Sequence, residues 1–182
     1  LEVSLTYQDC VSAVQAAKGA AERASAPASG LVDANINVST GLATDYLNHF
    51  NEAIMLLELV ASCPDCLNDL RNWRPLTYRE HFRASRFKRR ELAIAAYEAS
   101  DPAARACLDT LSATMTTVIE ATRATMTADL TPSASGALAE RAAAWLKVLV
   151  ARAGAVINGT IDDVAQPDVP QTMVDRLIEH TA

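Results

Sequence analysis

The chain has few aromatic residues, glycines and prolines, and it has no long apolar run. Aromatic residues make up 5% of its 182 residues, beside six glycines and seven prolines. No apolar run approaches the ~20 residues that a membrane-spanning helix needs. The strict alternation of apolar and polar residues that is typical of β-strands is missing as well. The apolar half of the composition is mostly Ala, Leu and Val, and small side chains of this kind favour closely packed helices.

Cysteine is also scarce. Four cysteines in a chain with this much apolar mass are too few to predict a disulfide scaffold. The N-terminal segment is amphipathic and lacks the apolar core of a signal peptide. We therefore expect a reducing, cytoplasmic setting. Cys63 and Cys66 form an isolated CxxC pair, and the sequence offers no second pair that would complete a zinc site.

Apolar residues recur at helical spacing in five segments that are separated by Pro, Gly and capping residues. The second segment shows the pattern well, because Leu42, Tyr46 and His49 follow one another at spacings of 4 and 3 residues. Thr77 and Glu80 have the spacing of a capping box, which begins a helix. Long helices are expected over 3–24, 40–62, 78–98, 102–128 and 133–158, and short helices over 65–73 and 171–180.

These segments predict an all-α fold with a single domain over residues 1–182. Helices of about 20 residues that are joined by short loops run antiparallel to their neighbours. We therefore expect an up-and-down antiparallel helical bundle of four to five long helices with short additional helices. The residues expected in one common core are Leu42, Leu56, Leu111, Met115, Trp145 and Leu149.

Positive charge is concentrated in residues 71–90. This segment holds 8 of the 16 Lys and Arg residues and a single acidic residue, Glu80, so its net charge is 8 − 1 = +7 in a chain of net charge −6. Such an asymmetry predicts an anionic ligand, an acidic partner, or an acidic surface of the protein itself. The negative total charge argues against general affinity for nucleic acid.

Four arginines of the helix expected over 78–98 share one face, within an arc of roughly 60° on a helical wheel. Arginine makes bidentate contacts to carboxylates and phosphates. Two interpretations stay open: a solvated face that pairs with acidic helices of the same bundle, or a recognition surface. The candidate ligand-binding residues are Arg79, Arg83, Arg86, Arg90, Phe82, Phe87 and Trp73.

A second candidate site surrounds His49, with Asp45 four residues before it and Glu52 three residues after it. These three side chains could hold a metal ion, although di-iron bundles use two Glu-x-x-His pairs and further glutamates. A histidine phosphotransfer domain is another option, but His49 lies in an apolar seam. The favoured interpretation is structural, with His49 buried and the two carboxylates paired with arginines of 78–98.

We predict a non-catalytic binding or regulatory protein that uses the basic, aromatic-flanked segment 71–90. An acidic protein surface or a phosphate-bearing ligand fits this segment, and nucleic acid fits it less well. No membrane partner and no cofactor are predicted, and homo-oligomerisation is left open. The alternatives are a small-molecule or metal site at Asp45, His49 and Glu52, and histidine phosphotransfer.

Overall fold

The computed structural model describes Ser12, Gln15 and residues 29–63, 66–126 and 130–160. Apart from Ser12 and Gln15, which are both helical, the segment 3–24 lies outside the described residues, as does the segment 171–180. Within the described ranges every regular element is a helix, and the β-structure is limited to one isolated bridge between Ile36 and Ala43. The predicted all-α class is confirmed for this part of the chain.

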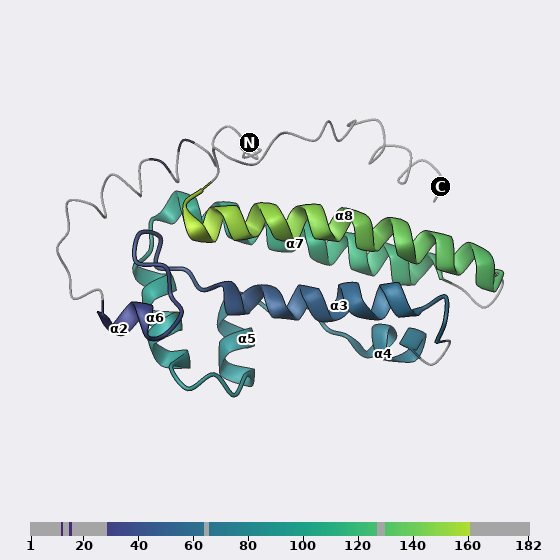
Figure 1. The fold of residues 1–182 in the computed structure, drawn as a ribbon, viewed down its shortest axis with the longest axis horizontal. Helices are drawn as coiled ribbons and strands as arrows, with labels where there is room; N and C mark the ends of the chain where they lie inside the picture. Colours follow the sequence, from purple (N-terminus) through teal and green to yellow (C-terminus); the bar gives the residue numbers. More distant parts are fainter. Residues whose placement is uncertain (1–11, 13–14, 16–28, 64–65, 127–129, 161–182) are drawn as a thin grey trace.

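The described helices are short at the start of the chain and long at its end (Figure 1). They are α2 (Ser29–Val32), the 3₁₀ turn η1 (Thr44–Leu47), α3 (Asn48–Leu59), α4 (Cys66–Asn72), α5 (Tyr78–Ala84), α6 (Arg90–Ala99), α7 (Pro102–Thr125) and α8 (Pro132–Asn158). Within these ranges, no helix combines the length and the apolar character that crossing a bilayer requires.

Helices α3, α7 and α8 lie side by side and form the body of the molecule (Figure 1). Helix α8 packs on both α3 and α7. It runs antiparallel to α3, since Gly136 lies beside Ala61 whereas Gly154 lies beside Leu47. Only a short connection separates α7 from α8, so these two helices are antiparallel as well. It follows that α3 and α7 run in the same direction.

The chain returns from the end of α3 through α4 and the non-helical segment 73–77. Helices α5 and α6 then form a hairpin that projects from one end of the body (Figure 1). A long helix was expected to make this return. The up-and-down arrangement of four to five long helices is therefore not confirmed.

The helix expected over 78–98 is in fact two helices, α5 and α6, with the turn 85–89 between them. Ser85 ends α5 in an extended conformation, with φ −73° and ψ 160°, and its hydroxyl accepts a hydrogen bond from Phe87 N at 3.3 Å. Serine competes with the helix for backbone hydrogen bonds, and like charges at i and i+4, such as Arg86 and Arg90, disfavour a continuous helix. The Phe87 ring then packs against Phe82, with centroids 5.3 Å apart.

The helix expected over 40–62 begins later than predicted, with η1 and then α3. Gly41 has φ +71°, a conformation that a helix does not contain and that glycine adopts readily. An ideal Cβ at this position would lie 2.9 Å from Ala96 O, so the backbones of the loop and of α6 approach closely here. Glycine thus permits both the turn and the contact.

Three predicted helix ends are confirmed by their caps: the starts at 78 and 102 and the end at 158. Thr77 and Glu80 form a complete capping box at the start of α5. Asp101 accepts hydrogen bonds from Ala103 N and Ala104 N before Pro102, which opens α7. Gly159 ends α8 in the left-handed conformation, with φ +67°.

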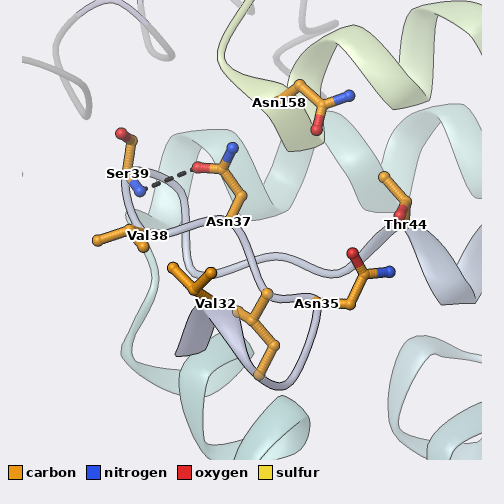
Figure 2. Close-up of a pocket in the computed structure, with 8 residues that line it drawn as sticks. Val32, Asn35, Asn37, Val38, Ser39, Thr44 and Asn158 are labelled. Carbon is orange, nitrogen blue, oxygen red and sulfur yellow. Dashed lines mark hydrogen bonds between the residues drawn. The ribbon is translucent and has the colours of Figure 1, made fainter. Parts of the chain in front are cut away.

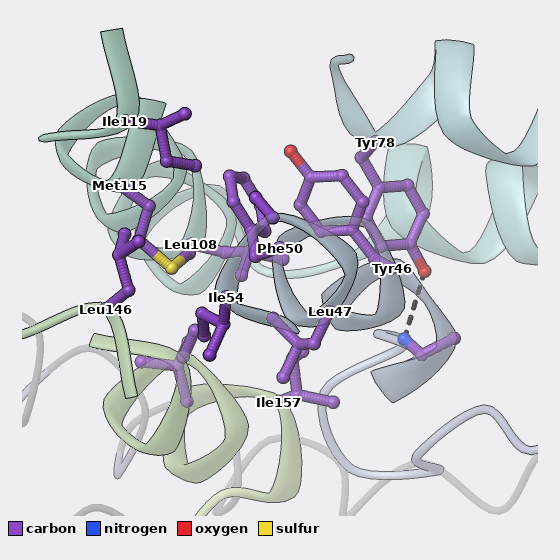
Figure 3. Close-up of a cluster of buried hydrophobic side chains, with 14 of the residues drawn as sticks. Tyr46, Leu47, Phe50, Ile54, Tyr78, Leu108, Met115, Ile119, Leu146 and Ile157 are labelled. Atoms are coloured by element: carbon purple, nitrogen blue, oxygen red, sulfur yellow. Dashed lines mark hydrogen bonds between the residues drawn. The ribbon is translucent and has the colours of Figure 1, made fainter. Parts of the chain in front are cut away.

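The hydrophobic core lies between α3, α7 and α8 and extends to buried residues of α4, α5 and α6 (Figure 3). Its fully buried side chains include Phe50, Leu57, Leu108, Met115, Ile119, Leu146 and Ile157. Of the predicted core, Leu42 and Met115 are fully buried. Leu56, Leu111 and Leu149 are partly buried at the edge of the core. Trp145 is half-buried and lies outside the cluster.

Two buried hydrogen bonds tie the loop before η1 to distant parts of the chain. Thr40 Oγ1 donates to Ile157 O at the end of α8, at 2.5 Å and across 117 residues. The Tyr78 hydroxyl of α5 accepts from Ala43 N at 3.0 Å (Figure 3). These contacts fix the base of the hairpin against the body.

The cysteines differ in redox state. Cys63 and Cys66 are reduced and take no part in a disulfide, whereas the buried Cys107 is disulfide-bonded. Disulfides persist mainly in oxidising compartments. This bond argues against the reducing setting that the cysteine count predicted.

Candidate functional site

The outer end of the α5–α6 hairpin carries five exposed basic side chains. We name this surface the basic tip, and it consists of Arg83, Arg86, Lys88, Arg89 and Arg90. No acidic residue lies between Arg83 and Arg90 in the sequence. Within the described residues, the one ion pair of the basic tip joins Arg90 Nε to Glu91 Oε1 at 3.5 Å, and the Glu91 side chain is 83% exposed. The basic tip is therefore a cationic surface with little internal compensation.

Glu80, the one acidic residue of the segment 71–90, forms hydrogen bonds at the start of α5. Its carboxylate accepts hydrogen bonds from Thr77 N at 2.8 Å and Thr77 Oγ1 at 2.7 Å. These hydrogen bonds lower the pKa of Glu80, and the charge of Arg83, one turn further on, contributes less. Glu80 thus caps the helix and offsets the charge of the basic tip only in part.

The carboxylates that were expected to pair with the basic segment bind other groups. Asp45 Oδ2 accepts from Asn35 Nδ2 at 2.7 Å, and Glu58 forms an ion pair with Lys147 of α8. Glu52 is exposed. Among the described residues, neither Asp45 nor Glu52 forms an ion pair with an arginine, so the predicted pairing is wrong.

Arg79 does not belong to the basic tip, although the helical wheel placed it there. It lies one turn before Arg83, and its Nε is 3.2 Å from Glu98 Oε1 of α6. Both side chains of this pair are half exposed. Its charge is matched locally, unlike the charges at the basic tip.

The three aromatic candidates are core or near-core residues. Trp73 is 6% exposed, Phe82 is 0% exposed, and Phe87 is half-buried against the core. None of them presents a free ring beside the arginines. Conversely, Lys88 and Arg89 were left out of the predicted site. The wheel assumed a continuous helix, whereas both residues lie in the turn.

A polar pocket at the base of the hairpin is lined by Arg79, Arg105 and Tyr97, among others. Arg105 Nη1 donates to the carbonyls of Tyr97 at 3.0 Å and Glu98 at 2.8 Å. The Tyr97 hydroxyl donates to the Asp109 carboxylate at 2.8 Å. The polar groups of this pocket therefore satisfy one another and give no reason to expect a ligand.

A second pocket is lined by amide, hydroxyl and aliphatic side chains from the end of α2, the loop after it, the start of η1 and the end of α8 (Figure 2). Asn37 Oδ1 accepts from Ser39 N at 2.9 Å and from Thr40 N at 3.1 Å, which shapes the loop. Asn35 donates to Asp45. No charged residue lines this pocket, so it has no group that would select an ionic ligand.

His49, the centre of the second predicted site, lies in an aromatic cluster between α3 and α5. Its side chain is 8% exposed and stacks on Trp73, with ring centroids 4.5 Å apart. The Trp73 indole N–H donates to His49 O at 3.2 Å. His81 of α5 is the next imidazole, 6.1 Å away between centroids. His49 Nε2 is buried and has no hydrogen-bond partner in the part of the chain that the structure describes.

Burial governs the ionisation of both imidazoles. Desolvation, the largest cause, and the nearby His81 together lower the pKa of His49 to about 4, against a smaller opposing effect of a hydrogen bond with the Arg74 backbone. Desolvation also lowers the pKa of His81, while the Asp45 charge acts in the opposite direction. Both histidines are therefore neutral at neutral pH.

The predicted metal ligands Asp45, His49 and Glu52 are not brought together. Asp45 binds Asn35, Glu52 is exposed, and the His49 ring faces Trp73. In the part of the chain that the structure describes, no three His, Cys, Asp or Glu side chains form a group that could hold a metal ion. A buried imidazole is also poorly placed to receive a phosphoryl group from a partner, so phosphotransfer gains no support.

No protein-family model, curated protein or solved structure matches this chain, and a functional proposal rests on its own residues.

Proposed function

We propose that the protein is a binding protein whose basic tip recognises an anionic partner, either an acidic protein surface or a phosphate-bearing ligand. One observation supports this most strongly: five exposed cations lie at the projecting end of a hairpin, and within the described part of the chain Arg90 alone of the five forms an ion pair. Like charges that lie this close repel one another and destabilise the turn. The cluster therefore does not stabilise the fold. This favours a role for it in recognition.

The composition of the basic tip favours recognition by charge and hydrogen bonds. Four of its five residues are arginines, whose planar guanidinium groups bind carboxylates and phosphates in a bidentate manner. Its one nearby aromatic ring, Phe87, packs inward. The Phe87–Phe82 contact and the Ser85 hydrogen bonds hold the turn in shape, and a preorganised surface loses less conformational entropy on binding.

The remaining charge of the molecule would orient this encounter. Outside residues 71–90 the chain holds 8 basic and 21 acidic residues, a net charge of −13. An anionic partner is repelled by such a body and attracted by the basic tip. Charge asymmetry of this kind raises association rates and aligns partners before contact.

Retention on polyanions tests this proposal. The test variant combines Arg83→Gln, Arg86→Gln and Arg89→Gln, and the control combines Arg71→Gln, Arg74→Gln and Arg141→Gln, which removes the same charge from exposed sites elsewhere. The native protein and the control should be retained on immobilised heparin and on immobilised polyglutamate, whereas the test variant should elute at much lower salt. A preference for one matrix would separate sulfate- or phosphate-like partners from carboxylate partners.

Equal retention of the test and control variants would show that total charge, and not the basic tip, determines binding. Circular dichroism should show that all three proteins are folded. A cytoplasmic location and homo-oligomerisation remain untested predictions, and the disulfide at Cys107 argues against the first of them.

A further inference from the structure

We propose that His49 and His81 form an acid-sensitive contact whose protonation loosens α5, and with it the basic tip, from α3. This property does not depend on what the basic tip binds. It follows from the positions of the two imidazoles and from the groups around them. It also follows from His49 Nε2, which has no hydrogen-bond partner among the described residues that could accept from it once it is protonated.

The histidine pair lies at the joint between the hairpin and the body. His49 belongs to α3 and His81 to α5. The His81 ring also contacts Tyr46 of η1, with centroids 5.7 Å apart, and the His49 ring contacts Phe50 at 5.5 Å. The docking of α5 therefore depends on ring contacts in which two of the rings can become charged.

Protonation of His49 is unfavourable in the docked state. A proton on Nε2 creates a buried N–H donor, and Nε2 has no partner among the described residues. A second cation on His81 would lie 6.1 Å away between ring centroids. Two like charges at this distance in a partly buried site repel strongly. Moving α5 away exposes the His81 ring and the side of the His49 ring next to it to water, and so reduces both free-energy costs.

The charged groups around the pair do not compensate for its protonation. From η1, the Asp45 carboxylate acts on His81, but it also binds Asn35. From the segment after α4, the Arg74 guanidinium donates to the Arg71 and Trp73 carbonyls. From α7, Arg123 donates to Trp73 O at 2.6 Å. Among these groups, a carboxylate acts on His81 alone, and none acts on His49.

The size of the effect follows from proton linkage. An exposed histidine has a pKa of about 6.5, and burial lowers the pKa of His49 to about 4 in the docked state. The open state therefore binds the proton more tightly. Lowering the pH from 7.5 to 5.0 should increase the open population about 30-fold through His49 alone. His81 acts in the same direction.

The other attachment of the hairpin contains no histidine. Helix α6 is tied to α7 by the hydrogen bond between Tyr97 and Asp109, and the Arg105 guanidinium lies over the Tyr97 ring at 5.6 Å. We therefore expect acid to affect α5 more than α6 and the body.

Hydrogen exchange measured by mass spectrometry tests the proposal on the full chain at pH 7.5 and 5.0. Rates are corrected for the intrinsic pH dependence of exchange. The protection of amides in 78–84 should fall about 30-fold or more at pH 5.0, while amides in 140–155 of α8 keep their protection. In the double variant His49→Phe and His81→Gln, which carries no titratable ring at either position, the fall should be absent.

Unchanged protection of 78–84 in the native protein at pH 5.0 would refute the proposal, as would an equal fall in the double variant. Should the double variant fail to fold, His81→Gln alone provides the same test, because His81 is only half-buried. This single variant should show a smaller fall in protection than the native protein. An identical fall would show that His81 contributes nothing and would refute the proposed pair.

Discussion

The Trp73 indole stacks on the His49 imidazole, with centroids 4.5 Å apart and ring planes within 20° of parallel. The same indole donates its N–H to the His49 carbonyl, and the Trp73 carbonyl accepts from Arg123 of α7. One residue after α4 thus contacts both α3 and α7. The segment 73–77, which has no regular structure, is fixed in place by these contacts.

Trp73→Ala should lower the free energy of unfolding by about 3–5 kcal/mol, because it leaves a large cavity and removes both the stacking on His49 and the indole hydrogen bond to the His49 carbonyl. Chemical denaturation followed by circular dichroism measures this loss. Trp145→Ala is the matched control: Trp145 is half-buried and lies outside the core, so its loss should cost less. A cost for Trp145→Ala equal to that for Trp73→Ala would contradict the assigned role of Trp73.

Acid should destabilise the protein through His49. The folded-state pKa of about 4 lies below the ordinary value of 6.5, so the unfolded state binds more protons between these values. Stability is complete above pH 6.5 and falls as the pH drops toward 4, by about 3 kcal/mol. Urea denaturation at several pH values measures this slope. His49→Phe should flatten it, and an unchanged slope in that variant would assign the effect to other groups.

Tyr78→Phe should lower the free energy of unfolding by about 1–3 kcal/mol, because the buried amide of Ala43 loses its hydrogen-bond acceptor. Tyr46→Phe is a comparison within the same aromatic cluster. The Tyr46 hydroxyl donates to the carbonyl of half-buried Leu76, which water can reach more easily, so the expected cost is smaller. Denaturation midpoints give the loss of stability in each variant. A larger loss for Tyr78→Phe than for Tyr46→Phe supports the role given to the Tyr78 hydroxyl.

Gly41→Ala should destabilise the protein by more than about 1 kcal/mol, because φ +71° is unfavourable for alanine and the new Cβ would lie 2.9 Å from Ala96 O. Gly30→Ala is the control: no atom lies within 4 Å of its ideal Cβ, and alanine favours the helical conformation of α2. This control should be neutral or slightly stabilising. Thermal unfolding distinguishes the two outcomes.

Thiol titration should find two thiols in each denatured, unreduced chain, those of Cys63 and Cys66. The chain has four cysteines, and Cys107 is disulfide-bonded. Full reduction before denaturation should raise the count to four. Four thiols without reduction would show that the disulfide does not form and would restore the argument for a reducing setting.

Local signals predicted much of the fold. The seam that contains Leu42, Tyr46 and His49 is buried as expected, and the caps at Thr77, Asp101 and Gly159 lie where the sequence placed them. Both features depend on residues a few positions apart. The buried seam and the helix caps can therefore be predicted without knowledge of the tertiary structure.

The break at Ser85 was not predicted, because a helical wheel assumes a continuous helix. It therefore cannot reveal where a helix ends. Serine and repelling arginines each destabilise a helix by a small amount. The inward packing of Phe87 against Phe82 further favours the break. The sequence identified the concentration of charge correctly. It did not show that Arg79 pairs with Glu98, since that contact depends on how α5 and α6 meet.

The hydrogen bond from Thr40 to Ile157 has a consequence for how the chain folds. It spans 117 residues, and the packing of α8 on α3 likewise joins distant parts of the sequence. The entropy of closing so long a loop is lost before these contacts can form. Helical bundles built from local pairs fold quickly, whereas contacts of high sequence separation slow folding. We therefore expect α7 and α8 to associate early, and the joining of α3 to α8 to limit the rate at which the native structure appears.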